Sequence, residues 1–289
     1  MVVVNQMTAN LRINEPDIKV GLTLVRMTGV NSTCILRIMN PKLSVIVPSY
    51  NEQKNLKRNV LGEIYDYLKA QDYDWELILS DDGSTDGTVE ELDKFAKKSP
   101  KIKVLHNPHK GKASTVTSGM MTATGDWRLF TDFDQSTPIQ ELEKLWYYTE
   151  KGFDVVIGSR EITGAKRDTE PFYRHLMGRV FNLAVQILAV PGILDTQNGF
   201  KLFSARATQE LFPMLKVYGK QRLRKDAFTG SVDVELLFLA IKKGYLVREV
   251  PIFWKHYKTD RVSPIKDSLR MFRDILRIRL ADFKGLYKI

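Results

Sequence analysis

From residue 43 onward, short apolar runs alternate with helical segments, and this alternation restricts the folds open to the chain. Strands are predicted over 43–48, 75–84, 101–107 and 127–134, and helices over 56–70, 88–98 and 114–123. Because parallel strands are joined by helical crossovers, repeated strand–helix–strand order predicts a mostly parallel sheet with helices on both faces. The expected fold class is therefore α/β with a Rossmann-like architecture.

The pattern divides the chain into three parts. Residues 1–40 lack sustained periodicity and are interpreted as an N-terminal extension that is poorly ordered or not native, with Met39 as a candidate physiological start. Residues 41–262 are expected to form one domain, because no repeat and no linker rich in Pro, Gly or Ser interrupts them. Residues 263–289 are interpreted as a basic amphipathic helix.

Two apolar segments are candidates for contact with a membrane. The eleven residues 180–190 are too few for a spanning helix, which needs about 20, so a core helix and an interfacial helix both fit. The C-terminal helix is expected to carry an apolar stripe of Ile265, Leu269, Phe272, Leu276 and Leu280. Packing of this stripe on the domain is the more frequent outcome, and binding to a membrane surface is the alternative.

The charge of the chain limits its partners, and its cysteine content limits its compartment. The 44 Lys and Arg exceed the 34 Asp and Glu, and the net charge of +10 favours an anionic phosphate ester, membrane or nucleic acid. Basic residues do not alternate with aromatic ones in the manner used to stack bases, so no nucleic-acid partner is expected. Cys34 is the only cysteine, which excludes an intrachain disulfide and a zinc cluster and favours a reducing compartment.

Polar clusters follow three of the predicted strands, at 48–52, 81–84 and 132–134. Ligands of such sheets bind beyond the carboxyl ends of the strands, so these clusters are expected to converge on one site. Asp132 and Asp134 could both bind a divalent cation through oxygen, and the cation would bridge the phosphates of a nucleotide diphosphate. Taken alone, an Asp-x-Asp sequence is more often a solvated turn.

Two further segments could bind a nucleotide. SDDGSTDGT supplies acids able to accept hydrogen bonds from a base or ribose, although Ser84 or Asp86 can also cap the following helix. Lys110 and Lys112 lie beside a glycine before another predicted helix, where their charges could meet phosphate. A solvated loop explains these lysines equally well.

In this order, VIVPSYNE, SDDGSTDGT, NPHKGKASTVTSGM and GDWRLFTDFDQSTP resemble the start of family 2 glycosyltransferases with the A-type fold. DVVIGSRE, DTQNGFKLF, DVELLFLA and GYLVREVPIFW resemble the branch of dolichyl-phosphate β-glucosyltransferases and polyprenyl-phosphate glycosyltransferases. The resemblance covers about residues 42–280. It implies an inverting hexosyltransferase, dependent on Mg²⁺ or Mn²⁺, that moves a hexose from a nucleotide sugar to dolichyl or polyprenyl phosphate. Glucose, from UDP-glucose, is the favoured hexose.

The resemblance also implies roles for individual residues. It places the nucleotide sugar against Pro48, Tyr50, Glu52, Asp81, Asp82, Gly83, Lys112 and Asp132. It places the metal on Asp132 and Asp134, and the acceptor phosphate on Arg160 and Arg174, since the arginine fork bonds phosphate oxygens in pairs. Near the sugar it places Gln197, Asn198 and Gly199, and it makes Asp233 and Glu235 catalytic candidates beside Asp134.

Several of these roles have alternatives. Asn198 stands where this loop usually has cysteine, Arg174 could belong to a plain basic surface, and Asp233 and Glu235 could cap the helix or pair with lysine. A lipid phosphate, with a second pKa of about 6, attacks without a strong base. No histidine base is therefore assigned, and all four are expected at the surface: His106, His109, His175 and His256.

Two other functions stay open. A transferase of the same fold acting on a polysaccharide or protein hydroxyl would need a carboxylate base, with Asp233 or Glu235 as the candidates. A non-catalytic, basic membrane-binding module is the second alternative. For the favoured function, the enzyme is expected on the cytoplasmic face of a membrane, bound peripherally, and its oligomeric state is not predicted.

Overall fold

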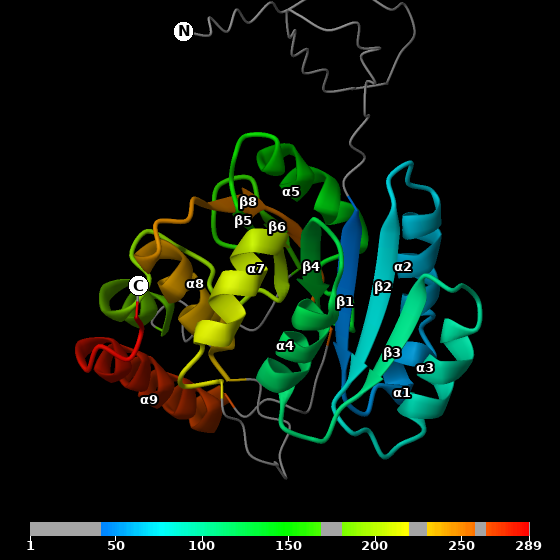
Figure 1. Cartoon of the computed structure of the whole chain (residues 1–289), viewed down its shortest axis with the longest axis horizontal. Coiled ribbons are helices and arrows are strands. Elements are labelled where there is room, and N and C mark those ends of the chain that lie inside the picture. Colours follow the sequence, from blue (N-terminus) through cyan, green and yellow to red (C-terminus); the bar gives the residue numbers. More distant parts are fainter. Residues whose placement is uncertain (1–41, 169–180, 220–229, 258–263, 289) are drawn as a thin grey trace, which may run out of the picture. The chain divides into compact units, whose positions relative to one another are not determined.

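The computed structural model describes residues 42–168, 181–219, 230–257 and 264–288, with side chains from 267 in the last range (Figure 1). Its centre is a seven-stranded sheet in the order β3-β2-β1-β4-β7-β5-β8. The strands are β1 Leu43–Ser49, β2 Trp75–Asp81, β3 Ile102–His106, β4 Trp127–Thr131, β5 Val155–Ser159, β7 Phe200–Ser204 and β8 Val247–Pro251. All pairings are parallel except those of β7, which runs antiparallel to β4 and β5, so the prediction of a mostly parallel sheet is confirmed.

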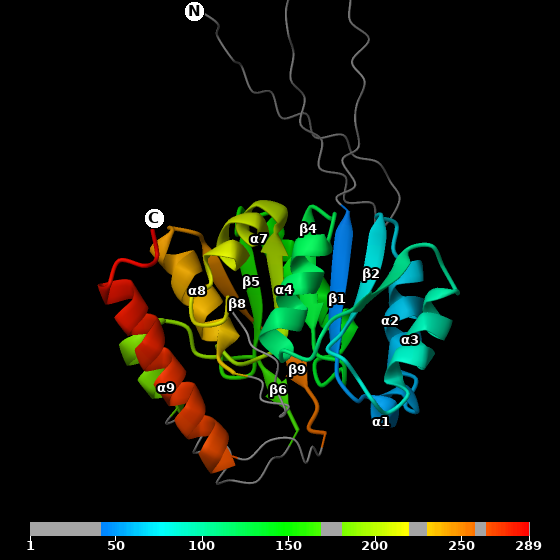
Figure 2. The ribbon, with the colours of Figure 1, turned by 60° about the horizontal axis from the view of Figure 1, so that its bottom comes forward.

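Helices cover both faces of the sheet (Figure 2). They are α1 Gln53–Leu56, α2 Val60–Lys69, α3 Thr88–Ala96, α4 Lys112–Thr122, α5 Leu142–Thr149, α7 Ala205–Leu211, α8 Val232–Lys242 and α9 Pro264–Phe283, and residues 181–188 are also helical. Alternate residues of β1 enter different cores: Ile46 belongs to the core cluster that includes residues of α4, α8 and α9, whereas Val45 and Val47 belong to the cluster that includes residues of α2, α3 and α5. This two-sided burial follows from the side-chain period of two in a strand.

Three local differences separate the structure from the sequence prediction. The helix expected over 56–70 begins only at Val60, as α2, because Asn59 adopts a left-handed conformation with φ of 59°, and the separate short helix α1 ends at Leu56. Helices α5 and α7 and strand β8 had not been predicted. A small second sheet pairs β6 Lys166–Arg167 with β9 Phe253–Trp254.

The sheet register aligns the polar strand ends at one edge. Ser49 at the end of β1 pairs with Asp81 at the end of β2, and Asp132 directly follows β4. In Figure 2 this edge lies at the bottom, together with α1, β6 and β9. The predicted convergence of the polar clusters is therefore a consequence of the parallel pairing of β2, β1 and β4.

The prediction that the apolar stripe of the last helix packs on the domain is wrong. Leu269, Phe272, Leu276 and Leu280 are exposed, and α9 instead buries Ile275, Ile278 and Ala281. The side chain of Ile265 lies outside the described side chains. Among the helices that the structure describes, none combines the length and apolarity needed to cross a bilayer.

Candidate active site

The turn after β2 is held together by its own two acids. Asp81 accepts hydrogen bonds from the hydroxyl of Ser49 at 3.0 Å and from the backbone N–H of Ser84 at 2.8 Å. Asp82 accepts from the backbone N–H groups of Lys110 and Gly111, at 3.0 and 2.9 Å. The turn therefore fixes the loop before α4, and Gly83, with φ of 74°, provides the left-handed residue that its tight path requires.

His109 belongs to this turn and is not the surface group that the sequence analysis expected. Its Nδ1 lies 2.8 Å from Oδ2 of Asp82, and its side chain is 16% exposed. Its ring stacks on Tyr50, with 4.1 Å between the centroids and an interplanar angle of 1°. Buried Nε2 of His109 has no hydrogen-bond partner among the described residues. The Tyr50–His109 stack thus places a flat aromatic surface beside the strand ends.

The segment after β1 is anchored to the neighbouring helices. Pro48 lies within β1, opposite Ser80 of β2. The backbone N–H of Glu52 donates to the hydroxyl of Thr88 at 2.7 Å, and its carboxylate accepts from the side chain of Asn55 at 2.6 Å. The segment is therefore rigidly placed next to the turn after β2.

Asp132 and Asp134 lie together at the end of β4. The side chain of Asp132 is 39% exposed and pairs with Nζ of Lys112 at 2.5 Å, while Asp134 accepts from the backbone N–H of Ser136 at 2.8 Å. Burial and the neighbouring Asp132 carboxylate raise the pKa of Asp134. Burial acts to lower the pKa of Lys112, but the carboxylates of Asp132, Asp233 and Asp134 outweigh it and raise this pKa.

These contacts test whether the acid pair could hold a metal. Two carboxylates that repel each other are suited to a divalent cation, which prefers oxygen ligands. No group of three or more His, Cys, Asp or Glu able to hold a metal occurs among the described residues. The pair fits a cation that takes its other ligands from phosphate and water.

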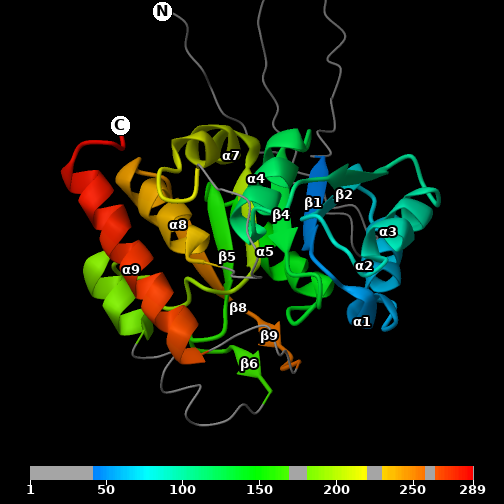
Figure 3. The ribbon, with the colours of Figure 1, turned by 90° about the horizontal axis from the view of Figure 1, so that it is seen from below.

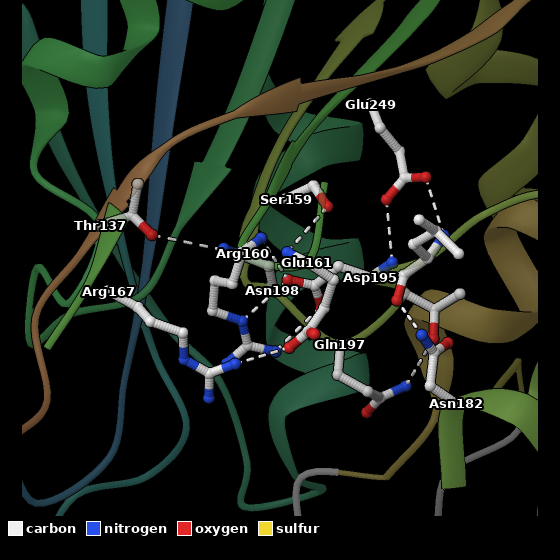
Figure 4. Close-up of polar contacts among 12 residues, drawn as sticks. Thr137, Ser159, Arg160, Glu161, Arg167, Asn182, Asp195, Gln197, Asn198 and Glu249 are labelled. Atoms are coloured by element: carbon white, nitrogen blue, oxygen red, sulfur yellow. Dashed lines mark hydrogen bonds and ion pairs between the residues drawn. The ribbon is translucent and has the colours of Figure 1, made fainter. Parts of the chain in front are cut away.

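Arg160, at the end of β5, is held by Asp195. Nε and Nη2 of Arg160 donate to the two oxygens of Asp195 at 2.8 and 2.9 Å, and its backbone N–H donates to the same carboxylate at 2.8 Å (Figure 4). Burial acts to raise the pKa of Asp195, but Arg160 outweighs it and lowers this pKa. The ring of Trp254 lies 5.4 Å from the Arg160 guanidinium carbon. The predicted partner Arg174 lies outside the described residues.

The loop before β7 joins the two halves of the site. Gly199 lies so close to Asp132 that a Cβ atom there would be 2.2 Å from Oδ2 of Asp132. The side chain of Asn198 is buried, with Oδ1 3.4 Å from the hydroxyl of Thr137. Gln197 is half-buried, and its amide lies 3.4 Å from the hydroxyl of Thr196. This loop therefore links Asp195 and Arg160 to the acid pair.

Lys201 is the buried residue that sequence reasoning missed. Its side chain is fully buried, its Nζ lies 2.7 Å from Oδ1 of Asp233, and it also donates to the backbone carbonyl of Asn198. The signal in the sequence was a lysine inside the otherwise apolar run of residues 200–203. A charged side chain is unusual in a buried strand.

The two candidate carboxylates of α8 have different surroundings. Asp233 is paired with Lys201, and its carboxylate helps to raise the pKa of Lys112. Glu235 is fully buried and accepts from the hydroxyl of Tyr287 and from three consecutive backbone N–H groups, those of residues 216–218. These contacts favour a structural role for Glu235.

The mostly parallel sheet, with Asp132 and Asp134 after its central strand β4 and Lys112 beside them, has the arrangement that the sequence resemblance implied, that of a glycosyltransferase with the A-type fold. The family model described as glycosyl transferase family 2 matches residues 44–212. The chain is 32% identical over 266 residues to the dolichyl-phosphate beta-glucosyltransferase of Dictyostelium discoideum, covering 87% of this chain and 78% of that protein. The corresponding human protein is 31% identical over 267 residues, covering 86% and 78%.

The fold is also shared with a solved structure. Glucosyl-3-phosphoglycerate synthase from Mycobacterium tuberculosis aligns with a TM-score of 0.57 and 19% identity, over 85% of this chain and 79% of that one. The chain belongs to glycosyl transferase family 2, as its motifs predicted.

Proposed function

We propose that this enzyme transfers glucose from UDP-glucose to dolichyl phosphate, or to a closely related polyprenyl phosphate, with inversion at the anomeric carbon. The proposal draws on the relatives of that name, which match over more than four fifths of this chain. The observation that carries it is the loop before β7, which connects an acid pair suited to a metal and a diphosphate with an arginine suited to a second phosphate.

The donor side is built from the ends of β1, β2 and β4. Asp132 and Asp134 would hold Mg²⁺ or Mn²⁺, which when bound stabilises the negative charge on the departing diphosphate. Lys112 adds a positive charge beside Asp132. The Tyr50–His109 stack and the Asp81–Asp82 turn provide a flat surface and hydrogen-bonding groups for the nucleoside.

On the acceptor side, the chemistry needs little help from a base. A phosphate monoester is largely doubly charged near neutral pH, so its oxygen is already a nucleophile. Asp233 is engaged with Lys201, and Glu235 with the backbone and Tyr287, which disfavours the alternative of a hydroxyl acceptor activated by either carboxylate. The guanidinium of Arg160, held in one orientation by Asp195, would align the phosphate for attack opposite the diphosphate.

The lipid acceptor places the reaction at a membrane surface. We infer that the enzyme binds this surface peripherally from the cytoplasmic side, which agrees with a sequence whose single cysteine provides no disulfide.

The test is transfer itself. The protein would be incubated with dolichyl or polyprenyl phosphate, Mg²⁺ or Mn²⁺ and a panel of labelled nucleotide sugars, and the label entering the organic phase would be measured. Incorporation from UDP-glucose, abolished by EDTA and giving a β-linked product by NMR, is expected. Label that remains entirely in the aqueous phase with every sugar would overturn the proposal.

A further inference from the structure

Helix α9 carries apolar side chains on two different sides. One side is buried in the domain: Ile275 and Ile278 are 0% exposed and Ala281 is 8% exposed. They pack in the core cluster that also contains Phe238 of α8 and Tyr287. This side alone explains why α9 is attached to the domain.

The second side of α9 is an apolar stripe in contact with solvent. It consists of five large side chains spaced three or four residues apart, with exposures of 67, 39, 46, 51 and 90% for Leu269, Phe272, Leu276, Leu280 and Phe283. Residues at this spacing lie along one side of a helix. Single exposed leucines are common on protein surfaces, but a continuous row marks a site of interaction.

A basic row runs directly beside this stripe. Arg270, Arg273, Arg277 and Lys284 each follow one of the stripe residues in the sequence. The acids of α9 form ion pairs: Asp267 with Arg270 at 3.9 Å, Asp274 with Arg277 at 3.2 Å, and Asp282 with Lys242. Arg273 and Lys284 add positive charge to these pairs. The surface of α9 therefore combines apolar and cationic groups.

A neighbouring helix also carries exposed apolar side chains. Residues 181–188 are helical and lie beside α9 in all three views (Figures 1, 2 and 3). Val185 is buried in the core, whereas Leu183 and Ile187 are 58% and 74% exposed. In Figure 2, α9 begins at the lower end of the molecule, where β6 and β9 and the ends of the parallel strands also lie.

We propose that the α9 stripe is the docking surface of this protein for an anionic lipid bilayer. Its leucines and phenylalanines would enter the headgroup and acyl boundary, and the basic row would contact lipid phosphates. The charge complementarity of this row selects a membrane over an apolar protein partner. The inference rests on the proposed function, since it specifies how the enzyme would reach a lipid-borne acceptor.

Vesicle flotation tests the docking surface separately from catalysis. The full chain would be mixed with two kinds of vesicle. One is made of phosphatidylcholine alone, and in the other about one third of the lipid is anionic phosphatidylserine. Binding to the anionic vesicles is expected for the wild type and should fall at least tenfold in L276E/L280E. The control L246E changes a leucine that is 57% exposed in the loop before β8, and it should bind like the wild type.

Charge variants and a soluble assay complete the test. R273Q/K284Q should weaken binding to anionic vesicles by roughly fivefold per charge, with little effect on the neutral ones. In detergent, transfer to a short-chain polyprenyl phosphate should be as fast in L276E/L280E as in the wild type. If the proposed function were wrong, the wild type would be inactive in this assay.

Equal flotation of L276E/L280E and wild type would overturn docking. A wild-type dimer that L276E/L280E dissociates, seen by analytical ultracentrifugation, would assign the stripe to a second copy instead.

Discussion

Lys201 on β7 and Asp233 on α8 form an ion pair in which Nζ and Oδ1 are 2.7 Å apart and the side chains are 0% and 3% exposed. Full burial of a lysine is uncommon, because the ammonium group loses its hydration. The same ammonium binds the carbonyl of Asn198, so the ion pair ties the loop before β7 to the first turn of α8. The contact therefore holds the loop that carries Asn198 and Gly199 next to α8.

Removing the lysine should destabilise the protein strongly. In K201M, Asp233 would be left buried without its counter-ion, and the free energy of unfolding should fall by about 3–5 kcal/mol. Chemical denaturation followed by circular dichroism measures this loss. K201M/D233L removes both charges and should recover most of the stability. The matched control K94M changes a lysine that is 77% exposed and should alter stability by less than about 0.5 kcal/mol. An unchanged midpoint in K201M would contradict the pairing.

The arginine at the end of β5 should affect the acceptor more than the donor. R160K keeps the positive charge but loses the planar fork held by Asp195, so the KM for polyprenyl phosphate should rise about tenfold or more. Initial rates at saturating UDP-glucose measure this change, and the KM for UDP-glucose should stay close to that of the wild type. R248K, at an arginine that stacks on Tyr148 on another part of the surface, is the control. A shift confined to the donor KM would argue against acceptor binding.

Glu76 should make stability dependent on acidic pH. Burial acts to raise its pKa, but the ion pair with Lys103 and the hydrogen bonds from Ser44 and Thr124 lower it from 4.5 to about 2. Because the pKa of Glu76 is lower in the folded than in the unfolded protein, its ionised carboxylate stabilises the fold at pH values above about 4.5. This stabilisation is lost as pH falls from about 4.5 towards 2. At pH 7 the free energy of unfolding of E76Q should therefore be about 3 kcal/mol lower than that of the wild type.

The pH dependence separates this effect from a general loss of packing. The stability difference between wild type and E76Q should narrow steadily below pH 5, when measured by urea denaturation at several pH values. E63Q alters an exposed glutamate of α2 and should show no such convergence. A difference that is constant from pH 7 to pH 3 would show that the charge of Glu76 is not the cause.

The sequence was most informative where a strand ends in acids. An apolar run followed by polar residues located β1, β2 and β4, and parallel pairing was enough to place Asp81 and Asp132 at the same edge. The motifs could not show that Asp82 binds the loop of His109, because that contact depends on the path of residues 107–111.

Burial was harder to predict than periodicity. Apolar spacing in the last helix indicated a stripe, but Ile275 and Ile278 supply a second one, and only the packing against α8 decides which is buried. Lys201 illustrates the same difficulty: its burial is made tolerable by Asp233, which lies 32 residues further along the chain and meets it only in the folded protein.

Asp134 offers the most direct test of the proposed chemistry. Burial and repulsion from the Asp132 carboxylate raise the pKa of Asp134, so the ionised pair is unfavourable in the free protein, and D134N should increase the free energy of unfolding at pH 7. The same change should lower turnover by about 10²–10³-fold, since the amide is a poorer ligand for a divalent cation. Thermal melts should show a stabilisation by UDP with Mn²⁺ in the wild type that D134N lacks. D66N, at an exposed aspartate of α2, is the control for the charge change. Full turnover in D134N would exclude a role for this carboxylate in holding the metal.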